Sequence, residues 1–160
     1  MTKDLNSSYW SDRWKQGDTG WDTGEITPPL KTYFDKLTDK NLSILIPGCG
    51  SGYEGSYLWE KGFRNLWMLD ISPLPLEKFA EVNSDFPVNQ LICGNFFEVN
   101  QQFDLIVEQT FFCALQPDLR KAYVRKMSEL LKPGGKLAGL LFGVIFEKEG
   151  PPFGGVEAEY

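Results

Sequence analysis

A glycine-rich turn and a carboxylate that follows it are the residues whose spacing most clearly predicts ligand binding. Gly48, Gly50 and Gly52 come after the apolar segment 42–46, and Asp70 ends the next apolar segment. Glycines let a backbone approach a ligand closely, and a carboxylate at the end of a second strand can accept hydrogen bonds from both hydroxyls of a ribose. Together they predict a site for a nucleoside.

Each of these residues also has an interpretation that involves no ligand. The glycines could form only a tight connection between a strand and a helix, and Asp70 could cap a helix or lie in solvent. The presence of the turn and the carboxylate together favours the ligand site. The spacing G-x-G-x-G differs from the G-x-G-x-x-G of dinucleotide binders, which disfavours a nicotinamide cofactor and hence an oxidoreductase.

The composition limits the catalytic chemistry. The 160 residues include no histidine, which excludes Ser-His-Asp triads, Cys-His dyads and histidine-ligated metals. Cys49, Cys93 and Cys113 lack the spacing of a metal site, so we expect reduced thiols and no metal. Cys113 is more readily a small buried hydrophobe than a nucleophile. Glu108 could help to deprotonate a thiol, although a solvated carboxylate at a strand end is the favoured interpretation.

Charge and hydropathy indicate the broad class of the protein. The net charge of −6 argues against a nucleic-acid partner, because such partners need clustered Lys and Arg. With 42% hydrophobic residues, the length fits one domain over residues 1–160. The N-terminus lacks the apolar core of a signal peptide, and no apolar segment reaches the roughly 20 residues that span a bilayer. We therefore expect a cytoplasmic protein with no membrane partner.

Short apolar segments alternate with amphipathic ones along the chain, which is typical of a parallel sheet wrapped by helices. We predict strands at 42–46, 66–70, 90–93, 103–108 and 136–146. Helices are predicted at 9–14, 28–37 and 53–61, and Asn6 is expected to cap the first of them. Two further helices are predicted to begin at Pro73 and Pro117, and the second of these is expected to end at 133–135. The prediction is an α/β fold: a doubly wound, Rossmann-like parallel sheet in the order 3-2-1-4-5, with helices on both faces.

Aromatic residues stand out in the N-terminal part and after the fourth predicted strand. Trp10 and Trp14 are spaced i,i+4 and share one face of a helix, and Trp21 lies in the loop that follows. These tryptophans can pack on the core, contact a cationic ligand, or do both. For Phe111 and Phe112, core packing is favoured over the lining of a pocket.

Eight short motifs cover nearly the whole chain. They are Tyr9-Trp10-x-x-x-Trp14, Gly20-Trp21-Asp22-x-Gly24 with Thr27-Pro28, Ile46-Pro47-Gly48-Cys49-Gly50-Ser51-Gly52-Tyr53, Leu69-Asp70-Ile71-Ser72, Gly94-Asn95-Phe96-Phe97, Phe111-Phe112-Cys113-Ala114, Leu130-Leu131-Lys132-Pro133-Gly134-Gly135 and Gly150-Pro151-Pro152-Phe153. With these motifs the sequence resembles the class I S-adenosylmethionine-dependent methyltransferases. Within them it resembles the thiopurine S-methyltransferase superfamily, in the branch of the thiol, thiocyanate and halide methyltransferases.

The resemblance implies a cofactor and a role for each matching residue. It implies S-adenosylmethionine as methyl donor and S-adenosylhomocysteine as product, with residues 1–40 as a helical cap over a Rossmann-like core at 41–160. Trp10, Trp14 and Trp21 would close over the cofactor and the acceptor, and Gly48 would pass beside the methionine portion. Asp70 would hold the ribose, Asn95 and Phe96 would contact the adenine, and Gln109 would face the methionine end or the acceptor.

The acceptor and the C-terminal part of the sheet are left open. The resemblance implies a small soft nucleophile (a thiol, thiopurine, thiocyanate, bisulfide or halide), but Gln109 stands where the resembled branches have tyrosine or arginine. A degenerate protein that binds the cofactor without turnover is the alternative. In the resembled family a closing hairpin follows the Gly150–Phe153 motif, whereas only residues 154–160 follow here. We therefore expect an unprotected fifth-strand edge that self-associates.

Overall fold

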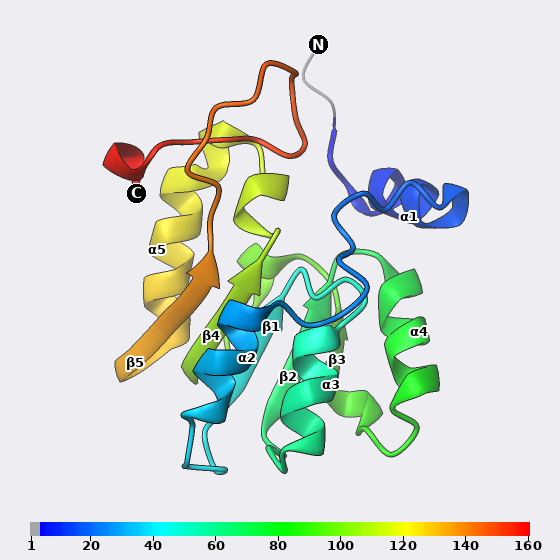
Figure 1. The fold of residues 1–160 in the computed structure, drawn as a ribbon, viewed down its shortest axis with the longest axis vertical. Coiled ribbons are helices and arrows are strands. Elements are labelled where there is room, and N and C mark those ends of the chain that lie inside the picture. The colour runs from blue at the N-terminus through cyan, green and yellow to red at the C-terminus, as the bar shows by residue number, and fades with distance from the viewer. Residues whose placement is uncertain (1–3) are drawn as a thin grey trace.

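The computed structural model describes residues 4–160, and residues 1–3 of the predicted N-terminal cap lie outside that range. Five parallel strands form one sheet in the order β3-β2-β1-β4-β5 (Figure 1), which confirms the predicted order. Their bounds are β1 Ile44–Pro47, β2 Leu66–Asp70, β3 Leu91–Cys93, β4 Phe103–Gln109 and β5 Leu131–Leu140. Because the chain order reverses at β1, the carboxyl ends of β1 and β4 form the switch point where ligands bind in such sheets.

Helices cover both faces of the sheet, as predicted. The α-helices are α1 Ser7–Gln16, α2 Pro28–Asp35, α3 Tyr53–Glu60, α4 Pro73–Val82 and α5 Arg120–Leu130. Short 3-10 helices are η1 Val88–Gln90, η2 Phe96–Glu98, η3 Phe112–Ala114, η4 Pro117–Leu119 and η5 Glu157–Glu159. On one face α2, α3 and α4 pack against β1, β2 and β4, and on the other face α5 packs against the same central strands. The buried strands therefore fix where their carboxyl ends emerge.

The helices begin where the sequence places a suitable first residue. The Asn6 side chain accepts a hydrogen bond from the Tyr9 N–H (3.0 Å) and caps α1, while Pro28 and Pro73 stand in the first turns of α2 and α4. The predicted helix from Pro117 is wrong in its first turn. Residues 117–119 form a 3-10 turn, and α5 begins at Arg120.

The fifth strand differs most from its prediction. It spans Leu131–Leu140 rather than 136–146, because the chain is already extended at Leu131, directly after α5. Phe103 pairs with Leu131 but Leu105 pairs with Lys136, so the segment 132–135 bulges instead of simply ending the helix. The side chains of β5 are also largely exposed or only partly buried, unlike those of the central strands. The Leu137 side chain is 43% exposed, since β5 pairs with β4 alone and forms the edge of the sheet.

Self-association through the β5 edge stays a prediction. Leu137 and Leu140 are exposed beside unpaired backbone, and such edges pair with other chains. We expect sedimentation of the 160-residue chain to show association that rises with concentration. Leu137→Lys should weaken it, whereas Val124→Lys, on the exposed surface of α5, should not. A monomer over the whole concentration range, with protected β5 amides in hydrogen exchange, would contradict the prediction.

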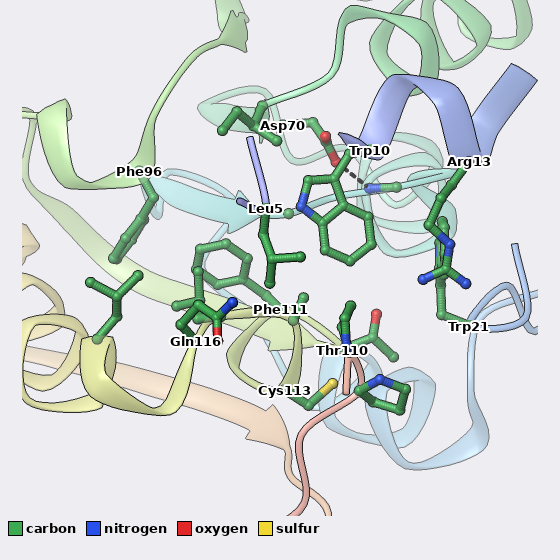
Figure 2. Close-up of a pocket in the computed structure, with 18 of the residues that line it drawn as sticks. Leu5, Trp10, Arg13, Trp21, Asp70, Phe96, Thr110, Phe111, Cys113 and Gln116 are labelled. Atoms are coloured by element: carbon green, nitrogen blue, oxygen red, sulfur yellow. Dashed lines mark hydrogen bonds between the residues drawn. The ribbon is translucent and has the colours of Figure 1, made fainter. Parts of the chain in front are cut away.

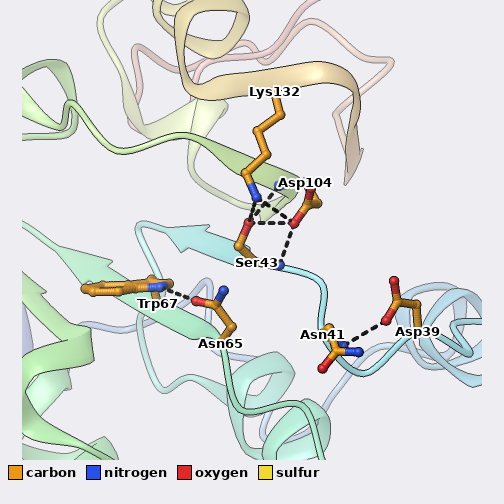
Figure 3. Close-up of polar contacts among 7 residues, drawn as sticks. All are labelled: Asp39, Asn41, Ser43, Asn65, Trp67, Asp104 and Lys132. Carbon is orange, nitrogen blue, oxygen red and sulfur yellow. Dashed lines mark hydrogen bonds and ion pairs between the residues drawn. The ribbon is translucent and has the colours of Figure 1, made fainter.

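A polar cluster holds the amino ends of the central strands (Figure 3). The Asp104 carboxylate accepts hydrogen bonds from the Ser43 N–H (2.8 Å) and hydroxyl (2.7 Å) and pairs with Lys132 (3.0 Å). The Ser43 hydroxyl and N–H, followed by Lys132, lower the pKa of Asp104 to about 2. The cluster ties the residues before β1 and within β4 to the bulged start of β5. It lies at the opposite end of the strands from the switch point.

Candidate active site

A cavity of about 930 Å³ lies between α1 and the carboxyl ends of the central strands (Figure 2). Every residue predicted for the site lines this cavity. These are Trp10, Trp14, Trp21, Gly48, Asp70, Asn95, Phe96 and Gln109. The fold therefore brings together side chains from the N-terminal segment and from the ends of four strands. The contact of each one with a ligand stays a prediction.

Asp70 lies at the end of β2, where its carboxylate is 8% exposed. Its Oδ2 accepts a hydrogen bond from the Gly50 N–H (3.1 Å), and its Oδ1 accepts one from the Ser72 N–H (2.9 Å). Burial raises the pKa of Asp70, although these hydrogen bonds oppose the rise. Neither interpretation without a ligand is correct, because Ser72 and not Asp70 is the cap residue of α4, and Asp70 is buried rather than solvated. A carboxylate has about four acceptor positions, so Asp70 keeps acceptor capacity for a ligand.

The glycine-rich turn takes a conformation that other residues rarely adopt. Gly48, Gly50 and Gly52 have φ values of +57°, +52° and +73°. A Cβ at Gly48 would overlap the Phe111 ring, and a Cβ at Gly50 would lie 3.8 Å from Trp14. The turn is therefore enclosed between the loop after β4 and the tryptophans of the N-terminal segment.

Three tryptophans form one wall of the cavity. Trp21 packs edge to face on Trp10 and Trp14, with ring centroids 5.5 and 5.8 Å apart. The Arg13 guanidinium lies 4.6 Å from the Trp21 ring centroid and pairs with Asp18 (2.9 Å). Trp14 is buried yet still lines the cavity. Core packing and cavity lining, the two roles predicted for the tryptophans, therefore occur together.

The remaining predicted residues lie after β3 and at the carboxyl end of β4. The Asn95 side chain accepts a hydrogen bond from the Phe97 N–H (3.0 Å), and Phe96 packs edge to face on Phe111 at 5.1 Å. Gln109 Oε1 accepts a hydrogen bond from the Thr27 hydroxyl (2.7 Å), which links β4 to the residue before α2. Phe111 belongs to the core and also lines the cavity.

Asp22 has a structural role that the sequence did not reveal. Its carboxylate accepts hydrogen bonds from the Gly24 N–H (2.8 Å), the Tyr53 hydroxyl (2.8 Å) and the Ser51 hydroxyl. Burial raises the pKa of Asp22, but the three hydrogen bonds outweigh it and the net shift is downward. Asp22 thereby fastens the loop that carries Trp21 to the glycine-rich turn. The Asp-x-Gly spacing indicates the local turn, but not its distant partners.

Glu108 is not the solvated carboxylate that the sequence favoured. It is 1% exposed and faces α5, where the Tyr123 hydroxyl donates a hydrogen bond to it (3.0 Å). Burial raises its pKa to about 7. Cys113 lines the cavity, and burial, with a contribution from the Glu108 charge, raises the pKa of its thiol to about 12. The thiol is therefore neutral near pH 7, as expected of a buried hydrophobe.

The described residues show neither a metal-binding cluster nor a membrane-spanning helix. Within 4–160, no group of three or more His, Cys, Asp or Glu side chains could hold a metal ion. No helix in the same range is both long enough and apolar enough to cross a membrane.

Comparison with known proteins identifies the family. Residues 5–160 match the family model described as thiopurine S-methyltransferase. The chain belongs to the thiopurine S-methyltransferase family. It is 34% identical to "Probable thiol methyltransferase 2" of Arabidopsis thaliana, over 100% of this chain and 73% of that protein. It is 35% identical to "Thiocyanate methyltransferase 1" of Brassica oleracea, over 96% of this chain and 70% of that protein.

A more distant member agrees with this assignment, and two solved structures share the fold. The thiopurine S-methyltransferase of Nitrosospira multiformis is 27% identical over 97% of this chain and 79% of that protein. The Burkholderia thailandensis 1,6-didemethyltoxoflavin-N1-methyltransferase superposes with a TM-score of 0.69 at 18% identity, and the CcbJ methyltransferase of Streptomyces caelestis with 0.66 at 22%. These matches cover 86% and 88% of this chain, but only 61% and 59% of the two solved chains. At these identities the match confirms the fold.

Proposed function

We propose that the chain binds S-adenosylmethionine in the cavity and catalyses transfer of its methyl group to a small soft nucleophile. One observation carries the proposal: the buried Asp70, bonded to the glycine-rich turn, shares a single cavity with three tryptophans. Family membership and the names of the relatives, which refer to thiols, thiocyanate and thiopurines, support the choice of acceptor.

The cavity suits this cofactor in charge and shape. Gly48 and Gly50 line the cavity and, lacking side chains, would let the methionine portion approach their backbone, and the remaining acceptor capacity of Asp70 suits ribose hydroxyls. Asn95 and Phe96 would contact the adenine. The indole rings that line the cavity would provide π faces for the positive sulfur. When bound, S-adenosylmethionine supplies a methyl group on a cationic sulfur that is already a good leaving group.

The chain's own task is to orient the acceptor and exclude water. We propose that the segment up to residue 40, with α1 and the Trp21 loop, acts as the cap, and that Gln109 orients the acceptor. A soft anion arrives ionised and needs no base. This agrees with the absence of histidine from the sequence and with the neutral Cys113 thiol. We therefore assign no catalytic residue in the sense of an acid or base.

Two alternatives are distinguished by binding and turnover. A degenerate protein would bind S-adenosylhomocysteine but methylate nothing, and a nicotinamide oxidoreductase would bind NAD. Calorimetry with both ligands, followed by a turnover assay, separates the three functions. The cytoplasmic location and the absence of a nucleic-acid partner stay predictions, supported by the three free cysteines and the acidic composition.

We expect soft sulfur nucleophiles to be methylated faster than catechols, amines or nucleic acid, because no imidazole is available to deprotonate the latter. The measurement is a mass-spectrometric screen of thiols, thiocyanate and halides with purified protein and S-adenosylmethionine. The Asp70→Ala protein serves as the control and should lose turnover on every acceptor. A higher rate on an oxygen or nitrogen acceptor than on any thiol would refute the expectation.

A further inference from the structure

We propose that Glu108, which does not line the cavity, is a positioning residue that holds the loop after β4 as the acceptor wall of the site. The inference rests on the proposed function for its effect on catalysis, and on geometry alone for its effect on the loop. It gives a role to a buried carboxylate that the methyl-transfer chemistry does not itself use.

The Glu108 carboxylate joins the loop to α5. Its Oε2 accepts hydrogen bonds from the N–H groups of Phe111 (3.2 Å) and Phe112 (3.4 Å). Its Oε1 accepts the hydrogen bond from the Tyr123 hydroxyl (3.0 Å). All of these groups are buried, so without the carboxylate the two amide donors would lose their partner away from water.

The loop needs such an anchor because its backbone is strained. Thr110 has φ +62°, and no other non-glycine residue within 4–160 has a positive φ. A side chain disfavours this conformation, so surrounding contacts must hold it. The next two residues are the ones whose amides Glu108 binds. The carboxylate therefore fixes the chain immediately after the strained position.

This loop forms one side of the cavity. Gln109, Thr110, Phe111 and Cys113 all line it. Figure 2 shows the last three of them. The Phe111 ring lies against the space over Gly48 and packs on Phe96. Asp70 ends β2 and Asn95 follows β3, so neither belongs to the segment that Glu108 anchors. A shift of the loop should therefore disturb the acceptor side more than the grip on the ribose.

The ionised carboxylate is the form that makes all three hydrogen bonds. The groups that face the Glu108 carboxylate are Tyr123 from α5, Cys113 from η3 and the Gly139 backbone from β5. The pKa values of Tyr123 and Cys113 are raised, so both side chains stay neutral. No cation is among the groups that shift the pKa of Glu108, which burial raises to about 7. Protonation would replace an acceptor with a donor, so the loop should loosen as pH falls below about 7.

The first experiment follows the loop without any turnover. Amide hydrogen exchange of Phe111 and Phe112 should be slow above pH 7, and should accelerate in Glu108→Gln after correction for intrinsic exchange rates. Glu81→Gln, at an exposed position on α4, is the matched control and should leave both amides unchanged. Protection that is the same in Glu108→Gln as in the parent protein would overturn the proposal, whether or not the protein is an enzyme.

The second experiment measures kcat/KM against pH with an acceptor that stays ionised throughout, such as thiocyanate or iodide. We expect a rise with pH centred near 7. Glu108→Gln should remove that rise and lower kcat/KM about tenfold or more, with the affinity for S-adenosylhomocysteine changed less than about threefold. Tyr123→Phe keeps the carboxylate but removes a hydrogen bond that lowers its pKa, so the rise should move to higher pH.

The outcomes separate the two proposals. A flat pH profile in the parent protein, or an unshifted one in Tyr123→Phe, would overturn the role of Glu108 in catalysis. If Glu108→Gln fails to fold, Tyr123→Phe still decides the question. Absence of turnover on every acceptor would instead refute the proposed function, while the exchange experiment would still test the anchoring of the loop.

Discussion

The Asp70→Ala protein is expected to bind S-adenosylhomocysteine about ten- to a hundredfold more weakly than the parent protein while keeping its fold. A charge-assisted hydrogen bond of the kind proposed here contributes about 1.5–3 kcal/mol, and each 1.4 kcal/mol is a factor of ten in affinity. Asp70 also accepts the Gly50 and Ser72 N–H groups, so its removal would loosen the turn that borders the ligand. Calorimetry measures the affinity, and near-ultraviolet circular dichroism checks the fold.

Two further variants sharpen the test of Asp70. Asp85→Ala removes an exposed carboxylate on the loop after α4 and should leave the affinity unchanged. Asp70→Asn keeps the shape and one acceptor oxygen but removes the charge, so its loss of affinity should be intermediate. Unchanged binding in Asp70→Ala would remove this residue from the site and with it the main support for a nucleoside ligand.

Gly48→Ala should reduce both stability and cofactor affinity, for two separable reasons. The φ of +57° costs a residue with a side chain about 1–2 kcal/mol, and the added methyl group would overlap the Phe111 ring. Overpacking of this kind typically costs about 1–3 kcal/mol, so the free energy of unfolding should fall by about 2–5 kcal/mol in total. Urea denaturation measures that fall. Calorimetry should show weaker binding, because Phe111 must move into the cavity or away from it.

Gly62→Ala is the matched control for this effect. Gly62 has φ +91° after α3, and a Cβ there would meet nothing within 4 Å. It should therefore show the backbone cost of about 1–2 kcal/mol without the steric cost. The difference between the two variants isolates the contact of Gly48 with Phe111. Equal losses of stability would show that this contact contributes nothing.

Much of the sheet was predictable because burial leaves a clear pattern in the sequence. The side chains of β1 are buried throughout, and β2 and β4 are nearly so, which produces the apolar segments from which the strands were placed. Asp70 interrupts such a segment at its last position, so its location at the carboxyl edge followed directly. The cavity-lining set was predictable for the same reason, since strand ends meet at one edge of a parallel sheet.

The errors arose where a residue's environment depends on partners far along the chain. The neighbouring residues in the sequence do not distinguish a solvated strand end from a buried one, so the sequence predicts a solvated Glu108. Its burial depends on Tyr123, 15 residues later, and on a turn at Thr110 that local preference disfavours. The start of β5 was misplaced because Pro133 and Gly134 usually end structure, whereas here they form a bulge anchored by Lys132 on Asp104.

The tryptophan wall also has a spectroscopic consequence. Three of the five tryptophans, Trp10, Trp14 and Trp21, lie in edge-to-face contact beside the cavity, while Trp59 and Trp67 do not line it. Tightly packed aromatic rings dominate the near-ultraviolet circular dichroism of a folded protein. Occupation of the cavity would change the surroundings of the first three indoles and leave the other two as a constant reference. The chain thus contains an unlabelled optical probe, with its own internal standard, for titrations and rapid-mixing kinetics of ligand binding.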